Sequence, residues 1–289
     1  GPPSSVGTGR PSRHPDEGEV PVHRAVSRAG PRAAQVVAAL VLASHPGPTV
    51  VVTALSAGLL AGAGASVARG ALATAAVLAG QLSVGWSNDW VDAGRDATVG
   101  RTDKPVVRGV LAAADLRRAA LAAAGVCAVL SWSTGAVPGT VHLVAVAAAW
   151  AYNLGLKDSA WSWAPYAVAF GLLPVFLVLT LPGRPLVAPW VVVGAALLGV
   201  GAHVANVLPD LEDDAATGVH GLPHRLGRTR ASLLAPAVLL AAVGVVVLGP
   251  SGPPTALGSV LGALAGVLAV AAGVVALSGC ALEHTGLAP

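Results

Sequence analysis

The sequence predicts an all-α protein built as a bundle of eight to nine transmembrane helices. Of its 289 residues, 54% are hydrophobic and only 11% are charged, whereas a soluble domain carries about 25% charged residues. A membrane helix needs roughly 20 apolar residues, so eight helices would occupy about 160 positions, close to the number of hydrophobic residues. High hydrophobicity with few charges excludes a soluble globular protein and also a disordered one.

Apolar segments follow one another through residues 33–289, which we interpret as one transmembrane domain. Each predicted span is long enough to cross a bilayer with some tilt. The spans are residues 46–66, 70–91, 110–134, 137–154, 161–180, 188–210, 230–249 and 254–282. The apolar stretch 33–44 is separated from the first span by His45-Pro46-Gly47-Pro48. It predicts a lead-in helix that lies on the membrane surface or is half buried in it.

Residues 1–32 have a different composition, rich in Pro, Gly, Ser and Arg, with no apolar run. A secretory signal peptide requires an apolar core, so we interpret this segment as a disordered cytosolic tail. The net charge of +3 is too small to indicate a nucleic-acid partner. Cys127 and Cys280 lie in apolar stretches without a CxxC pattern, which favours neither a disulfide framework nor a zinc site.

The basic residues predict the orientation of the bundle, because cytoplasmic loops carry an excess of Lys and Arg. With the N-terminus inside, 15 of the 17 basic residues fall on the inner side, and only Arg69 and Arg184 fall outside. Heavy use of Ala, Val, Gly and Arg is typical of a GC-rich bacterial genome. We therefore expect a multi-pass protein of a bacterial plasma membrane, with the N-terminus and the acidic loops in the cytoplasm.

Two acidic segments repeat with a constant offset of 118 residues. Six residues recur in register: Asn88 and Asn206, Asp92 and Asp210, Asp96 and Asp214, Gly100 and Gly218, Pro105 and Pro223, Gly109 and Gly227. Four spans separate the two copies, so both have the same orientation. The repeat therefore predicts two parallel four-helix halves that face one central cavity, an arrangement known among membrane proteins.

Helix geometry places each acidic triplet on one face, because residues four apart lie on the same side of a helix. Two carboxylate stripes that face each other would repel unless cations lay between them. Mg²⁺ prefers oxygen ligands and binds through one or two carboxylates together with substrate phosphates. Nearby basic residues would neutralise the rest: Arg101, Lys104, Arg108, Lys157 and Arg225. Above an apolar cavity, this pattern indicates a magnesium site for an isoprenoid diphosphate.

The same residues resemble a known family. Residues 88–96 (NDWVDAGRD) form an NDxxDxxxD motif, and residues 210–214 (DLEDD) form a DxxxD motif. Residues 100–105 (GRTDKP) resemble the basic segment after the first motif, and residues 152–157 (YNLGLK) resemble the Tyr and Lys loop after the fourth span. With this topology, the chain is similar to the UbiA-type intramembrane prenyltransferase superfamily.

The resemblance implies a Mg²⁺-dependent transferase of prenyl groups. The donor would be an allylic isoprenyl diphosphate, and the acceptor would be a hydrophobic molecule, aromatic or lipid-like, reached within membrane lipid. The catalytic carboxylates would be Asp92, Asp96, Asp210 and Asp214. The metal ligands would be Asn88, Asp89, Asp92, Asp96, Asp210, Asp213 and Asp214. The diphosphate-binding residues would be Asn88, Arg101, Lys104, Tyr152, Lys157 and Arg225.

Two other functions stay open at this point. A membrane terpene cyclase of the same superfamily would ionise the same diphosphate and let its own double bonds capture the cation. A transporter also uses parallel repeats with intramembrane acids. In a carrier, the binding site lies near the middle of the membrane, whereas the acids here lie at the inner ends of the helices.

Overall fold

The computed structural model describes residue 1 and residues 33–216, 218–253, 256, 258–260 and 262–271. Within these residues every regular element is helical, which confirms the predicted all-α class. The helices are α1 (Ala33–Ala43), α2 (Pro46–Gly62), α3 (Val67–Thr98), α4 (Ala113–Ser133), α5 (Ala136–Leu154), η1 (Leu156–Asp158), α6 (Ala164–Leu179), α7 (Pro189–Val207), α8 (Leu211–Ala216), α9 (Leu222–Leu226) and α10 (Arg228–Leu248).

Two predicted segments lie outside the described residues. They are the N-terminal tail of residues 1–32, apart from residue 1, and residues 272–282 at the end of the last predicted span. The chain divides into two units after Pro31, and the helices all belong to the second unit.

Several described helices are suited to a membrane. Helices α3, α5, α7 and α10 are each long and apolar enough to cross one, and the bent pair α1 and α2 makes a fifth span if it is counted as one. Helix α6 is a shorter apolar helix of 16 residues. Helix α4 has 21 residues, and its three charges lie near its start, at Asp115, Arg117 and Arg118. The count of eight to nine spans stays a prediction.

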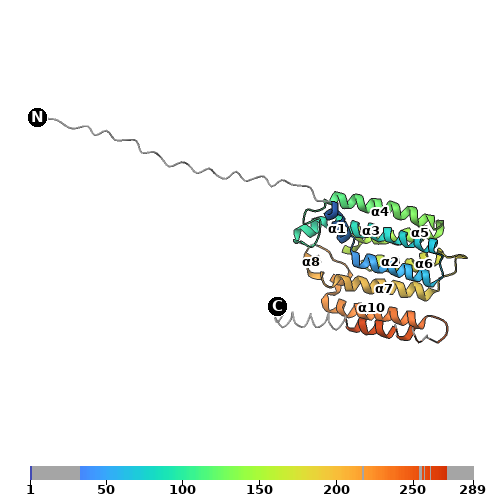
Figure 1. Cartoon of the computed structure of the whole chain (residues 1–289). Coiled ribbons are helices and arrows are strands. Elements are labelled where there is room, and N and C mark those ends of the chain that lie inside the picture. Colours follow the sequence, from blue (N-terminus) through green and yellow to red (C-terminus); the bar gives the residue numbers. More distant parts are fainter. Residues whose placement is uncertain (2–32, 217, 254–255, 257, 261, 272–289) are drawn as a thin grey trace. The chain divides into compact units, whose positions relative to one another are not determined.

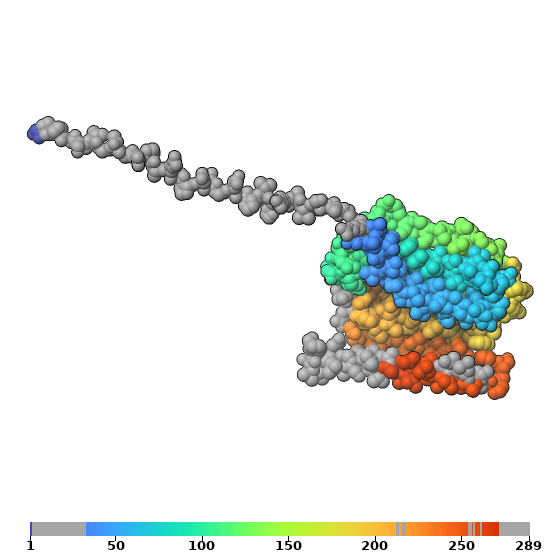
Figure 2. Space-filling view, in the orientation of Figure 1, coloured from blue at the N-terminus to red at the C-terminus, as the bar shows by residue number. Residues whose placement is uncertain are grey.

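Consecutive long helices pack against each other from α2 through α7, and α7 then packs on α10. Helix α3 also contacts α5, and α2 contacts α6. Figure 1 shows the long helices running side by side, with α8 and the loop after α3 at the same end of the bundle. One face of the molecule is formed by α2, α3 and α4, with α7 and α10 beside them (Figure 2).

The offset of 118 residues extends beyond the acidic segments to the helices themselves. Adding 118 to the bounds of α2 gives 164 and 180, and α6 spans 164–179. The same shift takes α4 to 231–251, within three residues of α10, and takes α3 to 185–216, where α7 and α8 lie. It takes α5 to 254–272, where the described residues are helical too. The backbone of the described residues therefore repeats with the offset that the predicted pair of halves requires.

The turns after the two acidic segments also match. Gly100 and Gly218 have φ values of 70° and 87°, a left-handed conformation that glycine adopts without steric cost. Gly109 and Gly227 have φ values of 71° and 77°. Pro105 and Pro223 are both fully buried. The repeated residues thus make the same turns twice, which explains why these residue types recur.

A bend of 70° separates α1 from α2. Contacts with α3 hold this part of the chain in place. His45 lies at the bend with a φ of 54°. The indole N–H of Trp86 donates a hydrogen bond to the Leu40 carbonyl oxygen, at 2.8 Å. A Cβ on Gly85 would lie 2.5 Å from the Ser44 carbonyl oxygen, so only glycine allows this approach. The predicted lead-in helix is therefore a separate helix, held against α3.

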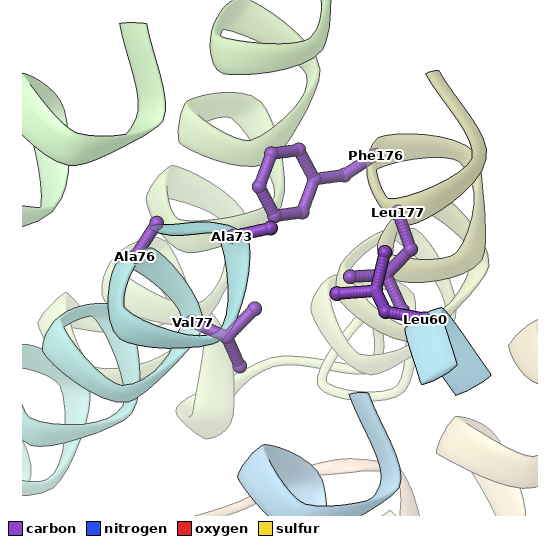
Figure 3. Close-up of a cluster of buried hydrophobic side chains, with 6 residues drawn as sticks. All are labelled: Leu60, Ala73, Ala76, Val77, Phe176 and Leu177. Atoms are coloured by element: carbon purple, nitrogen blue, oxygen red, sulfur yellow. The ribbon is translucent and has the colours of Figure 1, made fainter. Parts of the chain in front are cut away.

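Buried side chains of α2, α3 and α6 meet at the end of the bundle away from the acidic residues of α3. The cluster consists of Leu60, Ala73, Ala76, Val77, Phe176 and Leu177 (Figure 3). Phe176 and Ala76 have no exposed surface. Small alanines on α3 leave room for the Phe176 ring, which packs the three helices together below the site described next.

Candidate active site

A cavity of about 670 Å³ lies inside the bundle and reaches from its centre to the acidic end. Its described walls come from α1, α2, α3 and the loop after it, α5, η1, α6, α7 and α8, and none of its described lining residues belongs to α4 or α10. All six Asn and Asp residues of the repeat line this one cavity: Asn88, Asp92, Asp96, Asn206, Asp210 and Asp214. The central cavity predicted from the repeat is therefore present, with both acidic motifs on it.

The first motif lies on a helix that continues without a break to Thr98, seven residues beyond the predicted end. The Asn88 amide donates a hydrogen bond to the side-chain oxygen of Asn153, at 3.3 Å. Asn153 in turn donates to the Ser87 hydroxyl at 2.8 Å and to the Val84 carbonyl at 3.0 Å. Asn153 therefore ties α5 to α3 and fixes the position of Asn88 in the cavity wall.

Asp92 is paired with two cations. The ammonium group of Lys157, a buried side chain on η1, contacts one oxygen of Asp92. The Arg95 guanidinium lies 3.6 Å from the same oxygen and 3.0 Å from a carboxylate oxygen of Asp158. The negative charge of Asp92 is therefore balanced by basic residues of the protein.

Asp89 is the most deeply buried acid of the first motif, with its side chain 3% exposed. One of its oxygens accepts hydrogen bonds from Lys104 at 2.7 Å and from the His45 ring at 2.9 Å. Asp89 therefore holds Lys104 at the cavity and joins it to the bend between α1 and α2. Its direct role as a metal ligand stays a prediction.

The second motif is carried by two helices instead of one. Helix α7 ends at Val207, because Pro209 lacks a backbone N–H and its ring clashes with the carbonyl of the preceding turn. The residue at the matching position of α3 is Val91, which continues the helix. Asp210 lies in the resulting turn, and α8 then carries Asp214.

The charges around this second motif differ from those around the first. Burial, and then the neighbouring charge of Asp210, raise the pKa of Asp214 to about 6. His224 lies 3.6 Å from Asp214, but burial and the neighbouring His220 lower the pKa of His224. At neutral pH this imidazole supplies little positive charge. A cation bound beside Asp214 would favour its ionised form.

Every Lys and Arg that lines the described cavity comes from the helices and loops before α6. These residues are Arg95, Arg101, Lys104 and Lys157. The positions that match Arg101 and Lys104 in the second half are Val219 and Leu222. Arg101 lies 3.5 Å from a carboxylate oxygen of Asp210, so the loop of the first half supplies positive charge to the second motif.

Arg101 is oriented by its neighbour Asp103. Two hydrogen bonds, of 3.1 and 3.2 Å, join the guanidinium to the Asp103 carboxylate. These bonds raise the pKa of Arg101 further and lower the pKa of Asp103. The guanidinium is therefore held in one orientation, with Asp103 on one side and Asp210 on the other.

The donor set fits Mg²⁺ bound together with a phosphate ligand. Among the described residues no three acidic, His or Cys side chains converge closely enough to hold a metal without further ligands. Mg²⁺ does not require such a cage, because it keeps several waters and takes one or two carboxylates plus substrate phosphates. Burial, followed by the charge of Asp210, raises the pKa of Asp214, so a bound cation would favour the ionised form of this carboxyl. The oxygens of Asn88, Asp92, Asp96, Asp210 and Asp214 offer ligands around the same cavity.

Three further residues shape the site and were not predicted as site residues: Asn153, Tyr166 and Ser162. Tyr166 lines the cavity and packs edge-on against Tyr152, with ring centroids 5.1 Å apart. The Ser162 hydroxyl accepts a hydrogen bond from the Leu222 N–H at 2.9 Å and contacts the His203 ring at 3.0 Å. Asn153 had a signal in the sequence, as a polar residue inside an apolar helix. Ser162 had none.

The structure brings together most of the predicted site residues. The cavity is lined by Asn88, Asp89, Asp92, Asp96, Arg101, Lys104, Tyr152, Lys157, Asp210 and Asp214. Arg225 is exposed and does not line it, and its Nε–H donates a hydrogen bond to the His220 carbonyl oxygen at 2.9 Å. The side chain of Asp213 lies outside the described part of the structure. The roles of all these residues stay predictions.

The fold and the cavity define a class of helical membrane proteins in which paired carboxylate motifs lie above an apolar interior. Residues 35–282 match the UbiA prenyltransferase family, and the chain belongs to this family. The predicted resemblance is therefore confirmed.

Individual relatives agree with this assignment. The chain is 31% identical over 198 residues to the "Bacteriochlorophyll synthase 33 kDa chain" of Rhodobacter capsulatus, a match that covers 62% of this chain and 63% of the relative. The chain thus spans somewhat less than two thirds of that relative's length. Two solved structures of a UbiA homolog from Archaeoglobus fulgidus, bound to DMAPP and Mg²⁺ and to GPP and Mg²⁺, each superpose with a TM-score of 0.63. Both are 14% identical and cover 83% of this chain and 85% of theirs, which shows a shared fold.

Proposed function

We propose that this chain transfers an isoprenyl group from an allylic isoprenyl diphosphate to a hydrophobic acceptor, aromatic or lipid-like, with Mg²⁺-assisted loss of diphosphate. The observation that carries the proposal is the meeting of both acidic motifs with Arg101, Lys104 and Lys157 at one end of a single cavity. The isoprenyl diphosphates and Mg²⁺ bound by the solved UbiA homolog support this donor class and this metal.

The fixed positive charges would act on the leaving diphosphate. Arg101, Lys104 and Lys157 are already held in place by Asp103, Asp89 and Asp92. Because they need no reorganisation, they stabilise negative charge as it develops on the diphosphate oxygen. When bound, Mg²⁺ would add positive charge at the same oxygens, held by Asn88, Asp92, Asp96, Asp210 and Asp214.

Every bond that breaks or forms in this reaction belongs to the donor or to the acceptor. The allylic C–O bond breaks, and its electron pair leaves with the diphosphate. A carbon of the acceptor then forms a bond to the allylic cation and loses a proton. The apolar part of the cavity, with Val77, Val84, Val146, Phe170 and Leu173 in its wall, keeps water from the cation.

The test uses the purified full chain with labelled farnesyl or geranylgeranyl diphosphate, Mg²⁺ and candidate acceptors. We expect Mg²⁺-dependent diphosphate release together with a prenylated product. Asp92→Ala should lose this release, while the control Asp115→Ala, at the exposed start of α4, should retain it. If no diphosphate is released under any condition and Asp92→Ala behaves like wild type, the proposal is wrong. A cyclic hydrocarbon formed without acceptor would identify a terpene cyclase instead, and counterflow of a charged solute in proteoliposomes would identify a transporter.

We also propose that the acidic end faces the cytoplasm of a bacterium, with membrane lipid around the bundle. The reason is the concentration of Lys and Arg near that end, as the positive-inside rule describes. An impermeant thiol reagent should label Asp103→Cys only in inverted vesicles, and Arg184→Cys only in right-side-out vesicles. The reverse pattern would contradict this orientation.

A further inference from the structure

The cavity contains a polar side chain far from the acidic motifs. His142 of α5 is 3% exposed, yet it lines the cavity. The lining residues Val52, Val77 and Leu173 give this part of the wall an apolar character. An imidazole in such surroundings needs an explanation, because buried polar groups are nearly always hydrogen-bonded.

One nitrogen of the His142 ring is bound to the protein. Nδ1 lies 2.7 Å from the Ser131 hydroxyl of α4, and Cys127 of the same helix is 3.7 Å from that hydroxyl. The ring stacks on Phe176 of α6, with centroids 4.4 Å apart and planes 13° apart. Because α4 contributes no described residue to the cavity wall, Nδ1 is directed away from the cavity and the ring is fixed in place.

The other nitrogen, Nε2, is directed differently. Within the described residues Nε2 makes no hydrogen bond, whereas Nδ1 contacts the Ser131 hydroxyl at 2.7 Å and the Cys127 sulfur at 3.9 Å. Since Nδ1 is turned toward α4, Nε2 is the nitrogen that is available to the cavity. It is a donor or an acceptor according to the tautomer that Ser131 selects. A hydroxyl oxygen satisfies either tautomer, and a carbonyl oxygen satisfies the donor.

The position of His142 separates it from the diphosphate site. Gly80 of α3 lies opposite the ring, since a Cβ on it would be 3.5 Å from Cε1 of His142. Gly80 precedes Asn88 by eight residues, which corresponds to about 12 Å along the helix. An isoprenyl chain contains no oxygen, so the matching hydrogen-bond partner must belong to the other reactant.

We propose that His142 forms a hydrogen-bonding subsite for a hydroxyl or carbonyl oxygen of the hydrophobic acceptor. The oxygen lies on the side of the acceptor that faces away from the reacting carbon. This proposal rests on the proposed function in one respect, namely that the bound molecule is the acceptor of the prenyl group. The binding of an apolar molecule that carries an oxygen does not depend on the proposed function.

The test compares two fluorescent probes of similar shape, 2-naphthol and 2-methylnaphthalene. Binding to the purified full chain is measured in detergent, with protein-free detergent as the blank. We expect wild type to prefer 2-naphthol about tenfold, the effect of one net hydrogen bond. His142→Phe keeps an aromatic ring to stack on Phe176 and should remove the preference. His142→Gln retains a hydrogen-bonding group and should restore part of it, and Ser133→Ala on the exposed side of α4 should leave it unchanged.

Two results would overturn the subsite. One is equal affinity of wild type for both probes, or a preference that His142→Phe leaves intact. The other is that His142→Phe changes the preference of the protein between geranyl and farnesyl diphosphate, because this result would place the ring against the prenyl chain. Wild-type diphosphate release is measured in parallel: if it is absent while the naphthol preference depends on His142, the proposed function fails and the subsite stands.

Discussion

The two acidic motifs share a backbone design but differ in how their charge is balanced. In the first half, α3 carries the motif through an unbroken helix, and Lys104, Lys157 and Arg95 lie against its carboxylates. In the second half, Pro209 interrupts the helix, and no Lys or Arg of that half lines the described cavity. The comparison indicates that one set of basic residues serves both motifs: Lys104, Lys157 and Arg95 lie at the first, and Arg101 lies at the second.

The most severe test of this comparison removes the central acid of the first motif. Asp92→Ala should lower the rate of diphosphate release about 10³-fold, because a ligand is lost and Lys157 is left without its partner. The rate is measured with labelled farnesyl diphosphate at saturating Mg²⁺. Retention of more than a tenth of the wild-type rate would show that the first motif is not needed for ionisation.

A second test asks whether the first motif depends on its internal cations for stability. Lys104→Ala leaves Asp89 buried with only His45 beside it, which should destabilise the protein by about 3 kcal/mol. The double variant Asp89→Asn/Lys104→Ala should recover part of that loss, because no buried charge remains. Unfolding in mixed micelles measures the stability of the single and the double variant. Equal stabilities of Lys104→Ala and wild type would contradict the importance of this pair.

A third test separates the two motifs by their need for metal. Asp214→Asn should raise the Mg²⁺ concentration for half-maximal rate about tenfold, because it removes a ligand from the side poorest in positive charge. Lys157→Gln should raise the KM for the donor and leave the Mg²⁺ requirement close to wild type. Titration of Mg²⁺ at fixed donor distinguishes them. The comparison fails if Lys157→Gln shifts the Mg²⁺ requirement more than Asp214→Asn does.

The smallest expected effect is on stability, and it concerns the glycine turns that the two halves share. Gly100→Ala and Gly218→Ala each force a side chain into a left-handed turn, which should cost about 1–2 kcal/mol of stability. The costs should be similar, because the two φ values are similar. Gly94→Ala, inside α3 and with open space around it, is the control and should not destabilise. Markedly unequal costs for the two turns would weaken the case for equivalent halves.

Hydropathy and the offset of 118 residues were sufficient to predict the helical class, the two halves and the cavity that they enclose. The end of α7 was predicted three residues too late, because apolar composition continues through Leu208 while Pro209 prevents the helix from continuing. Conversely, α3 extends past residue 91 because its polar residues are paired inside the cavity, a stabilisation that local composition does not express.

The partners of the acids were the least predictable part of the site. His45 and Asp89 are 44 residues apart, and Lys157 and Asp92 are 65 apart. Neither pair follows from helix spacing, because the contacts depend on how α2 and η1 pack against α3. Arg225 was expected near the diphosphate on the basis of its charge, but its side chain bonds to the His220 carbonyl at the surface.

Two long helices, α4 and α10, contribute no described residue to the cavity, and this has consequences for the surrounding bilayer. Helices α4 and α10 occupy matching positions in the two halves and have 21 residues each, or about 32 Å, close to the thickness of a hydrocarbon core. Val126, Val129, Leu233 and Val246 on these helices expose about half or more of their surface. Hydrophobic thickness is therefore set largely by residues that the chemistry does not use. Substitutions at these exposed positions of α4 and α10 can adapt the protein to a thinner or thicker membrane without altering its interior.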